Sequence, residues 1–281
     1  MKQIKLTFIG GGNMAASLIG GLLADKLPAK QITVAAPTAN TRDYLSGHFG
    51  VNTEADNVAA ITEATVVVLA VKPQMLQSVA ETLASAVQEF QPLIITIAAG
   101  IRSVDINRWL AGETGDNVAI VRAMPNTPAL LQTGATGLFA NAQVSEAQRN
   151  LAESILRAVG LALWVEKEDQ MDAVTALSGS GPAYFFRIME AMESAGTQLG
   201  LSTETAHLLT LQTALGAAKM ALESNEAIGV LRERVTSPGG TTEQGLRVMS
   251  EQDIDGLMAQ VLKAASDRSR ELAKLSGKIK K

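Results

Sequence analysis

Short runs of apolar residues recur along the first 165 residues of the chain. Each run is nearly continuous in its hydrophobicity, which is typical of a strand buried on both faces. Residues 14–23, 75–87 and 145–159, which lie between such runs, place apolar side chains at helical spacing. Strands and helices that alternate in this way predict a doubly wound parallel sheet with helices on both faces. The expected strands are residues 4–9, 32–36, 65–71, 93–98, 118–124 and 162–165.

The pattern changes in the second part of the chain, where residues 183–199, 203–222 and 254–275 have the spacing of long helices. We therefore predict an α/β domain over residues 1–165 and an all-α domain over residues 166–281. Small residues alternate with large apolar ones in these helices, so they could pack closely within one bundle or against a second chain. We favour a homo-oligomer, because helices this apolar need more cover than one such domain provides.

The composition of the chain argues against several classes of partner and cofactor. The formal net charge of −4 offers no field that would hold a polyanion, so we expect no nucleic-acid partner. The chain has no Cys, which excludes disulfides and thiolate metal sites and fits a reducing cytoplasm. Only two His are present, so we expect no metal site and assign the chemistry to an organic cofactor.

Residues 6–24 carry no charge and superficially resemble a signal peptide or a membrane span. Three glycines, Gly10 to Gly12, and Asn13 interrupt the segment at its centre, where an inserted helix tolerates them least. We therefore expect no membrane association.

The segment FIGGGNMA carries the first chemical motif. Gly10, Gly12 and Ala15 have the spacing G-x-G-x-x-A directly after an expected strand and at the start of an expected helix. Gly10 permits the tight turn, Gly12 lets the backbone approach a pyrophosphate, and the helix N-terminus faces the anion. A glycine-rich turn without a ligand is the alternative.

The end of the second expected strand indicates which dinucleotide binds. An NAD site usually has an acidic residue there for the ribose 2′-hydroxyl, whereas this chain continues Ala36, Pro37, Thr38. Thr38, Asn40, Thr41 and Arg42 offer hydroxyl, amide and guanidinium donors to a 2′-phosphate instead. We therefore predict a preference for NADPH, with NADH possible. A merely solvated Arg42 is the alternative.

Residues 236–242 open another expected helix in the second domain. Gly239 and Gly240 stand between hydroxyl residues, which makes either an anion nest suited to a carboxylate or an ordinary helix start. Residues 124–128 (MPNTP) and 178–182 (SGSGP) also fix their backbone with Pro or Gly and offer small polar groups.

Together, the segments FIGGGNMA, AVKPQ, MPNTPA, LSGSGPAY and SPGGTTEQGL, in this order, resemble the pyrroline-5-carboxylate reductase family. The resemblance implies an N-terminal Rossmann-type domain followed by an all-α C-terminal dimerisation domain. It also implies an intertwined homodimer, often assembled into a ring of dimers. The implied reaction is the NADPH-dependent reduction of the cyclic imine 1-pyrroline-5-carboxylate to L-proline, the last step of proline biosynthesis, by hydride transfer to the protonated imine carbon.

The resemblance also implies site residues. Thr242 is the expected catalytic residue, hydrogen-bonded to the ring nitrogen, while Asn57 either contacts the cofactor or caps the helix after Asp56. The expected substrate-binding residues are Ser237, Gly239, Gly240, Thr241 and Thr242, with Ser180 and Asn126 closing the pocket. The expected cofactor-binding residues are Ile9, Gly10, Gly11, Gly12, Asn13, Met14, Thr38, Asn57, Ala70, Val71, Lys72, Pro73, Ala98 and Ala99, to which the strand-end argument adds Arg42.

The sequence leaves two other functions open. A related reductase could act on a different imine or on a 3-hydroxy acid, in which case we expect it to lack the SPGGTT loop or to use a catalytic Lys and Asn. A protein that only senses NADP would bind the nucleotide without needing a second polar loop.

Overall fold

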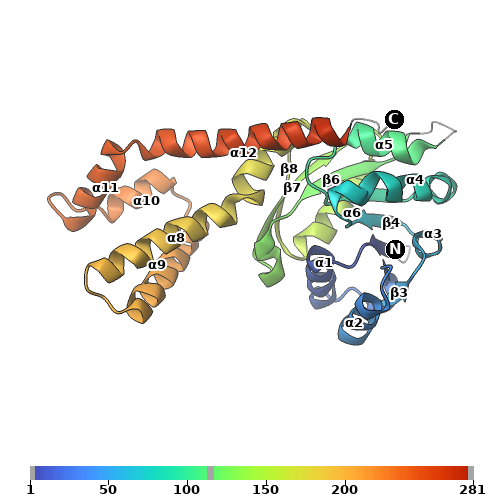
Figure 1. Cartoon of the computed structure of the whole chain (residues 1–281), viewed down its shortest axis with the longest axis horizontal. Helices are drawn as coiled ribbons and strands as arrows, with labels where there is room; N and C mark the ends of the chain where they lie inside the picture. The colour runs from blue at the N-terminus through green and yellow to red at the C-terminus, as the bar shows by residue number, and fades with distance from the viewer. Residues whose placement is uncertain (1–3, 113–116, 278–281) are drawn as a thin grey trace. The chain divides into compact units, whose positions relative to one another are not determined.

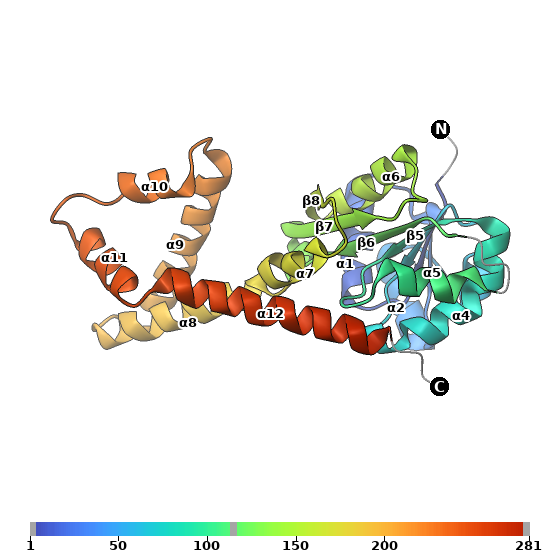
Figure 2. The same cartoon turned by 90° about the horizontal axis from the view of Figure 1, so that it is seen from above.

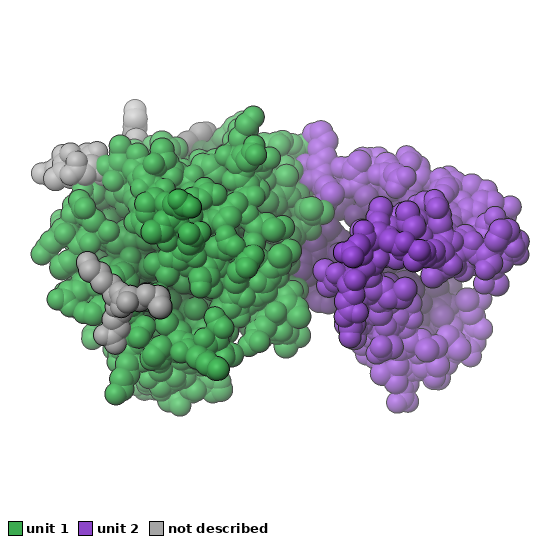
Figure 3. Space-filling view, turned by 180° about the vertical axis from the view of Figure 1, so that it is seen from behind, with its two compact units in different colours: residues 1–180, 264–281 green, residues 181–263 purple. Residues whose placement is uncertain are grey.

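The computed structural model describes residues 4–112 and 117–277 (Figure 1). The chain forms two compact units, coloured separately in Figure 3. Unit 1 comprises residues 1–180 and 264–281, and unit 2 comprises residues 181–263. Residues 166–180 group with unit 1 because the short helices in this segment pack against a strand of the sheet. The functional division at residues 165 and 166 is a different partition and stays a prediction.

Unit 1 is built on one eight-stranded sheet with the order β3-β2-β1-β4-β5-β6-β7-β8. Strands β5, β6, β7 and β8 of this sheet are labelled in Figure 2. Neighbouring strands are parallel except β6 and β7, which are antiparallel. The predicted doubly wound sheet is therefore confirmed, with one antiparallel pair added. The strands are β1 (Leu6–Ile9), β2 (Ile32–Ala35), β3 (Asn52–Glu54), β4 (Val66–Leu69), β5 (Leu93–Thr96), β6 (Ile120–Met124), β7 (Gly134–Ala140) and β8 (Gly160–Trp164).

Two of these strands, β3 and β7, are absent from the sequence-based expectation. The sequence of β3 is the polar tripeptide NTE, and that of β7 is GATGLFA, which is rich in small residues with low strand propensity. Pairing with the neighbouring strands stabilises both. Tertiary contacts therefore overrode local propensity at these two positions.

Helices cover both faces of the sheet (Figure 1). Side chains of β1 and β4 alternate between the two layers: Phe8 and Val68 enter one core with α1 and α6, whereas Ile9 and Leu69 enter the other core with α4 and α5. The helices of unit 1 are α1 (Asn13–Ala24), α2 (Ala39–Phe49), α3 (Asn57–Ala60), α4 (Pro73–Phe90), α5 (Ser103–Ala111), α6 (Glu146–Arg157) and α7 (Gln170–Val174), with 3-10 turns η1 (Ala29–Gln31) and η2 (Thr127–Leu131) and a π-helix η3 (Thr175–Gly179).

Unit 2 is entirely helical, as the sequence predicts. It contains α8 (Gly181–Gln198), α9 (Thr203–Glu223), α10 (Ile228–Arg234), α11 (Thr241–Glu251) and the first part of α12 (Ile254–Ser276), whose residues from Ala264 onward belong to unit 1. Helices α8 and α9 pack against each other.

Most apolar side chains of unit 2 remain exposed within a single chain. In residues 181–263, all of which the structure describes, only Gly181, Ala206 and Thr210 are buried. Phe185 and Phe186 are each 64% exposed. Among residues 4–112 and 117–277, no helix is long and apolar enough to cross a membrane.

Candidate active site

The turn between β1 and α1 has the geometry of a phosphate-binding turn. Gly10 has φ of +103°, and a Cβ atom there would lie 2.7 Å from the carbonyl oxygen of Ala70, so the position requires glycine. Gly12 is the N-cap residue of α1 and faces open space. Among the described residues, no side chain caps this helix end, so its first backbone N–H groups are available to an anion.

This turn opens into a surface cavity of about 420 Å³. The cavity includes Gly12 on one side and Thr41 and Tyr44 of α2 on the other. Open space beside a glycine and an uncapped helix N-terminus fits the pyrophosphate and the adjacent ribose of a dinucleotide. Its lining residues are Gly11, Gly12, Asn13, Ala16, Asn40, Thr41, Tyr44 and Leu130.

Three of these lining residues, Ala16, Tyr44 and Leu130, were not identified from the sequence. Tyr44 follows Asn40 by four positions, so the two share a face of α2, and this helical spacing is the signal that could have found it. Leu130 lies far away in the chain, on η2, and its sequence context carries no such signal.

The region after β2 holds the groups expected to contact a 2′-phosphate. Thr38 Oγ1 donates to Thr41 Oγ1 at 2.8 Å. The guanidinium of Arg42 donates to the backbone carbonyl oxygens of Ala36 at 2.7 Å and Pro37 at 3.0 Å. Arg42 therefore stabilises this loop through hydrogen bonds and is not a merely solvated side chain. Its contact with a phosphate stays a prediction.

Asn57 is the first residue of α3, and the helix is capped by its neighbour. Asp56 Oδ1 accepts a hydrogen bond from the backbone N–H of Ala59 at 2.8 Å. The alternative in which Asn57 acts as the cap is therefore wrong. Its contact with the cofactor is untested.

The other expected cofactor residues of unit 1 meet at one edge of the sheet. Strands β1, β4 and β5 are neighbours, with Ile9 in register with Leu69 and Leu69 in register with Thr96. The segments 70–73 and 98–99 therefore follow adjacent strand ends, where open parallel sheets bind ligands. Lys72 is the exposed N-cap residue of α4.

Asn126 links two of the segments expected to close the pocket. It is 8% exposed, its Nδ2 donates to the carbonyl oxygen of Ser178 at 3.0 Å, and its Oδ1 accepts from the N–H of Ala135 at 2.8 Å. Ser178 lies in the π-helix η3, a rare conformation that is frequent at functional sites. Ser180 follows directly and donates its N–H to the carbonyl oxygen of Thr175 at 2.8 Å.

In unit 2, the loop before α11 has the expected glycine turn, with φ of +73° at Gly239. Both glycine N–H groups have partners within the loop: Gly239 donates to Glu243 Oε2 at 2.7 Å and Gly240 donates to the Ser237 carbonyl oxygen at 2.9 Å. The sequence did not reveal this pairing. Thr241 and Thr242 are exposed in the first turn of α11. The loop thus already binds one carboxylate, that of Glu243.

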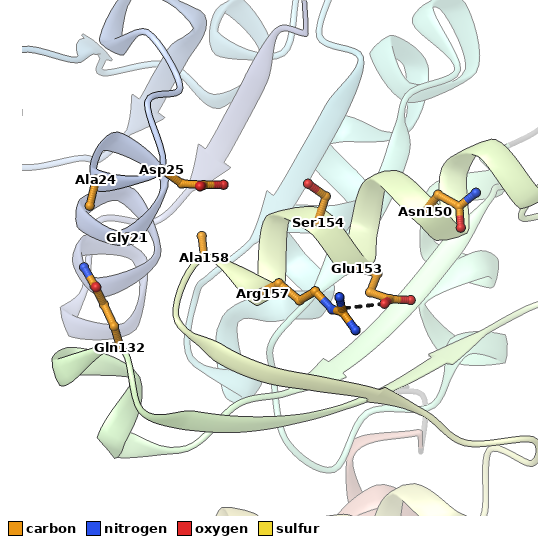
Figure 4. A pocket seen from close by; sticks show the side chains of 9 residues that line it. All are labelled: Gly21, Ala24, Asp25, Gln132, Asn150, Glu153, Ser154, Arg157 and Ala158. Atoms are coloured by element: carbon orange, nitrogen blue, oxygen red, sulfur yellow. Dashed lines mark ion pairs between the residues drawn. The ribbon is translucent and has the colours of Figure 1, made fainter. Parts of the chain in front are cut away.

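A second cavity of unit 1, of about 550 Å³, contains none of the expected site residues (Figure 4). It lies between the C-terminal end of α1 and helix α6. Arg157 and Glu153 form an ion pair at its wall, with 3.1 Å between Nε and Oε1. Glu153 also accepts a hydrogen bond from the indole of Trp164 at 2.7 Å.

The mostly parallel sheet and its glycine turn define the class of dinucleotide-binding oxidoreductases. Comparison with protein families identifies the family within this class. The profile described as "NADP oxidoreductase coenzyme F420-dependent" matches residues 5–100, and that described as "Pyrroline-5-carboxylate reductase dimerisation" matches residues 168–272.

Full-length relatives agree with these profiles. The pyrroline-5-carboxylate reductase of Pseudomonas aeruginosa is 53% identical over 277 residues, covering 99% of this chain and 100% of that protein. That of Vibrio alginolyticus is 43% identical, covering 98% of this chain and 100% of that protein.

Two solved structures agree with the fold. A pyrroline-5-carboxylate reductase from Coxiella burnetii superposes with a TM-score of 0.92 at 48% identity, covering 97% of this chain and 99% of that one. The Plasmodium falciparum pyrroline carboxylate reductase, solved with NADP bound, has a TM-score of 0.82 at 28% identity, covering 97% and 99% of the two chains.

The chain belongs to the pyrroline-5-carboxylate reductase family. It is an NADP-dependent oxidoreductase, and the dimerisation family that matches residues 168–272 indicates homo-oligomerisation. The resemblance noted from its motifs is therefore confirmed.

Proposed function

We propose that this chain reduces 1-pyrroline-5-carboxylate to L-proline with NADPH, as the last step of proline biosynthesis. The observation that carries the proposal is the end-to-end match with this reductase family, in a chain whose two glycine motifs each open a helix. The first motif suits a pyrophosphate and the second suits a carboxylate, which are the two anions that this reaction requires.

NADPH is held by unit 1 in this proposal. The N-terminus of α1 binds the pyrophosphate, while Thr38 and the free guanidinium donors of Arg42 bind the 2′-phosphate. NADH lacks that phosphate, so we expect it to be used less well. When bound, NADPH supplies the hydride that forms the new C–H bond, and the C=N electron pair goes to the already protonated nitrogen.

The substrate is held by the loop of residues 237–242. The carboxylate of Glu243 accepts a hydrogen bond from the N–H of Gly239 in the structure. A substrate carboxylate must therefore displace Glu243 or bind at the N–H groups of Thr241 and Thr242. Thr242 orients the ring nitrogen through its hydroxyl, and Ser180 and Asn126 close the pocket. Asn126 acts in part through its hydrogen bond to Ser178.

A strong protein acid is unnecessary for this reaction, because the protonated imine is already electrophilic. The two histidines have other partners, which supports this point. The His48 ring stacks on that of Tyr44 with centroids 5.4 Å apart, and His207 Nδ1 lies 2.7 Å from Glu193 Oε1. The residues of this chain therefore position the reactants rather than transfer the proton.

The proposed functional domains are residues 1–165 for NADP and residues 166–281 for substrate binding and dimerisation. Two chains would form a homodimer through the helical domain, which could assemble further into a ring of dimers. The cytoplasm is the proposed location. One site built from two chains is testable by mixing a Gly12 variant with a Thr242 variant and looking for restored activity.

The testing experiment measures oxidation of NADPH and of NADH in the presence of 1-pyrroline-5-carboxylate, with proline identified as the product. We expect turnover with NADPH to exceed that with NADH. Thr242→Ala should lower kcat about 10- to 1000-fold, the range typical of an orienting donor, and Thr242→Ser, which keeps the hydroxyl, should retain most activity. NADPH binding without turnover of this imine would contradict the proposal.

A further inference from the structure

Three acidic residues at the start of α7 bind three other segments of unit 1. Glu168, Asp169 and Asp172, here called the acid clamp, contact the start of α5, strand β6 and the last part of α12. None of them belongs to the expected site. Their contacts nevertheless converge beside the turn that follows β5.

Asp172 is the buried centre of the acid clamp, with 2% of its surface exposed. Its Oδ2 accepts from Nη2 of Arg102 at 2.9 Å, and its Oδ1 accepts from the hydroxyl of Ser269 at 2.7 Å. Arg102 donates through Nη1 to Asp169 Oδ1 at 2.7 Å, so one guanidinium bridges two carboxylates. Burying a carboxylate is costly unless it is paired in this way, so these contacts hold one arrangement.

Glu168 holds the first residue of α5 from outside that helix. Its Oε1 accepts from the backbone N–H of Ser103 at 2.6 Å, and its Oε2 accepts from the Ser103 hydroxyl at 2.9 Å. A carboxylate at this position is also favoured by the helix dipole. Glu168 Oε1 accepts a further bond from Nη1 of Arg122 on β6 at 2.9 Å. Burial lowers the pKa of Arg122, an effect that the attraction of Glu168 opposes.

The segment held by these contacts is the Ala98–Gly100 turn. It connects β5 to Arg102 and Ser103, so its far end is anchored by the acid clamp while its near end is anchored by the sheet. Gly100 has φ of +68°, and a Cβ atom there would lie 3.2 Å from Cβ of Leu272. Helix α12 therefore covers this turn, and Ser269 ties the same helix to Asp172.

The sheet order determines which half of a dinucleotide this turn faces. Strand β2 lies on one side of β1, and β4 and β5 lie on the other. With the pyrophosphate at the β1 turn and the 2′-phosphate after β2, the nicotinamide half extends over the ends of β4 and β5. The acid clamp also directly precedes η3, which contains Ser178, the partner of Asn126. It thus connects two segments on the nicotinamide side.

We propose that the acid clamp is a positioning device for the nicotinamide half of NADPH, with Asp172 acting through Arg102 on the Ala98–Gly100 turn. The inference rests on the proposed function for its cofactor. It predicts that Asp172 affects the binding of the nicotinamide half of the dinucleotide only. A purely structural carboxylate would affect both halves alike.

The test compares two ligands that differ in the nicotinamide half. Dissociation constants for NADPH and for 2′-phospho-ADP-ribose, which lacks the nicotinamide, are measured for the parent protein and for Asp172→Asn. We expect the variant to bind NADPH about tenfold more weakly, since a misplaced turn costs alignment, and to bind 2′-phospho-ADP-ribose within about twofold of the parent. The matched control is Glu153→Gln, which removes a carboxylate paired with Arg157 and Trp164 in the same unit and should change neither constant.

Two milder variants keep the test decisive if Asp172→Asn fails to fold. Ser269→Ala removes one hydrogen bond to Asp172, and Arg102→Lys keeps the charge but loses the fork that bridges Asp169 and Asp172. Both variants should weaken the binding of NADPH but not that of 2′-phospho-ADP-ribose, while their Tm stays close to that of the parent protein. Equal weakening of both ligands, or unchanged NADPH binding in the folded variants, would overturn the inference.

The same experiment separates this inference from the proposed function. If the parent protein binds NADPH but does not reduce 1-pyrroline-5-carboxylate, the proposed substrate is wrong, while the comparison of the two ligands still tests the acid clamp. If the parent protein reduces 1-pyrroline-5-carboxylate and the variants show no selective loss of NADPH binding, only the proposed role of the acid clamp is wrong.

Discussion

The two compact units of this chain bury their apolar residues in different ways. Unit 1 has a hydrophobic core on each face of its sheet, and large side chains such as Phe8 and Leu69 are fully buried there. Unit 2 buries three residues of 83, although its helices carry many large apolar side chains. A sheet with helices on both faces can cover its own apolar surface, whereas the helices of unit 2 leave theirs exposed within one chain. We therefore expect folding and association to be coupled in unit 2.

The largest effect on stability is expected from a substitution in the core of unit 1. Phe8→Ala should destabilise the protein by about 3–5 kcal/mol, because it leaves a cavity under a fully buried ring. The free energy of unfolding, measured by denaturant titration, should fall by this amount. Tyr44→Ala, at a 57% exposed ring, is the control and should cost much less. Equal losses in the two variants would mean that unit 1 does not depend on its own core.

The next effect concerns association through unit 2. Phe186→Asp places a charge on a surface that the partner chain should cover, so the oligomer should dissociate about 100-fold more readily. Sedimentation velocity over a range of protein concentrations measures this change. Ser85→Asp, which adds the same charge to an exposed position of α4, should leave assembly intact. Unchanged assembly of Phe186→Asp would show that this side chain lies outside the interface.

A smaller effect is expected for cofactor choice, which we assign to unit 1 alone. Arg42→Ala should reduce the ratio of kcat/KM for NADPH to that for NADH about tenfold, since a charge-assisted contact with the 2′-phosphate is lost. Its oligomeric state should match that of the parent protein. The adjacent Asp43→Asn serves as the control. A ratio that does not change would mean that the guanidinium only ties the loop carbonyls of Ala36 and Pro37.

The smallest effect is expected at the surface of unit 1, where Lys5 pairs with Glu63. The hydrogen bond from Lys5 lowers the pKa of Glu63 below its ordinary value. The stability from this pair is therefore present above the ordinary Glu pKa of about 4.3 and is lost as the pH falls through the lowered pKa. Lys5→Gln should lower Tm slightly at pH 7, and this difference in Tm should shrink as the pH falls through the lowered pKa of Glu63. A difference that grows toward low pH would reverse the assigned sign.

Much of the fold could be predicted from the hydrophobic pattern. All six expected strands and the long helices exist, with ends that differ by a few residues. The strands β3 and β7 were missed because their sequences are polar or rich in small residues, and pairing with neighbours stabilises them. The antiparallel β6–β7 pair likewise depends on partners distant in the chain.

The candidate site could be predicted only where a local motif carries it. The G-x-G-x-x-A spacing located the β1–α1 turn, because glycine at Gly10 is a backbone requirement that shows in the sequence. Tyr44 and Leu130 were missed, since they approach that turn only after folding. The hydrogen bond between Gly239 and Glu243 was missed as well, because the competing carboxylate belongs to a residue that looked like an ordinary helix start.

The sequence by itself determined the alternation of strands and helices, the glycine turn and the family, because each of these follows from the spacing of residues within short segments. Only the tertiary structure showed that Asp172, Arg102 and Ser269 meet, since these residues are 70 and 97 positions apart along the chain. It also showed which apolar side chains of unit 2 stay exposed within one chain, such as Phe185 and Phe186, whereas the helical spacing had indicated only that these helices need more cover. Burial and pairing depend on which segments come together in space, and no local pattern of residues encodes that information.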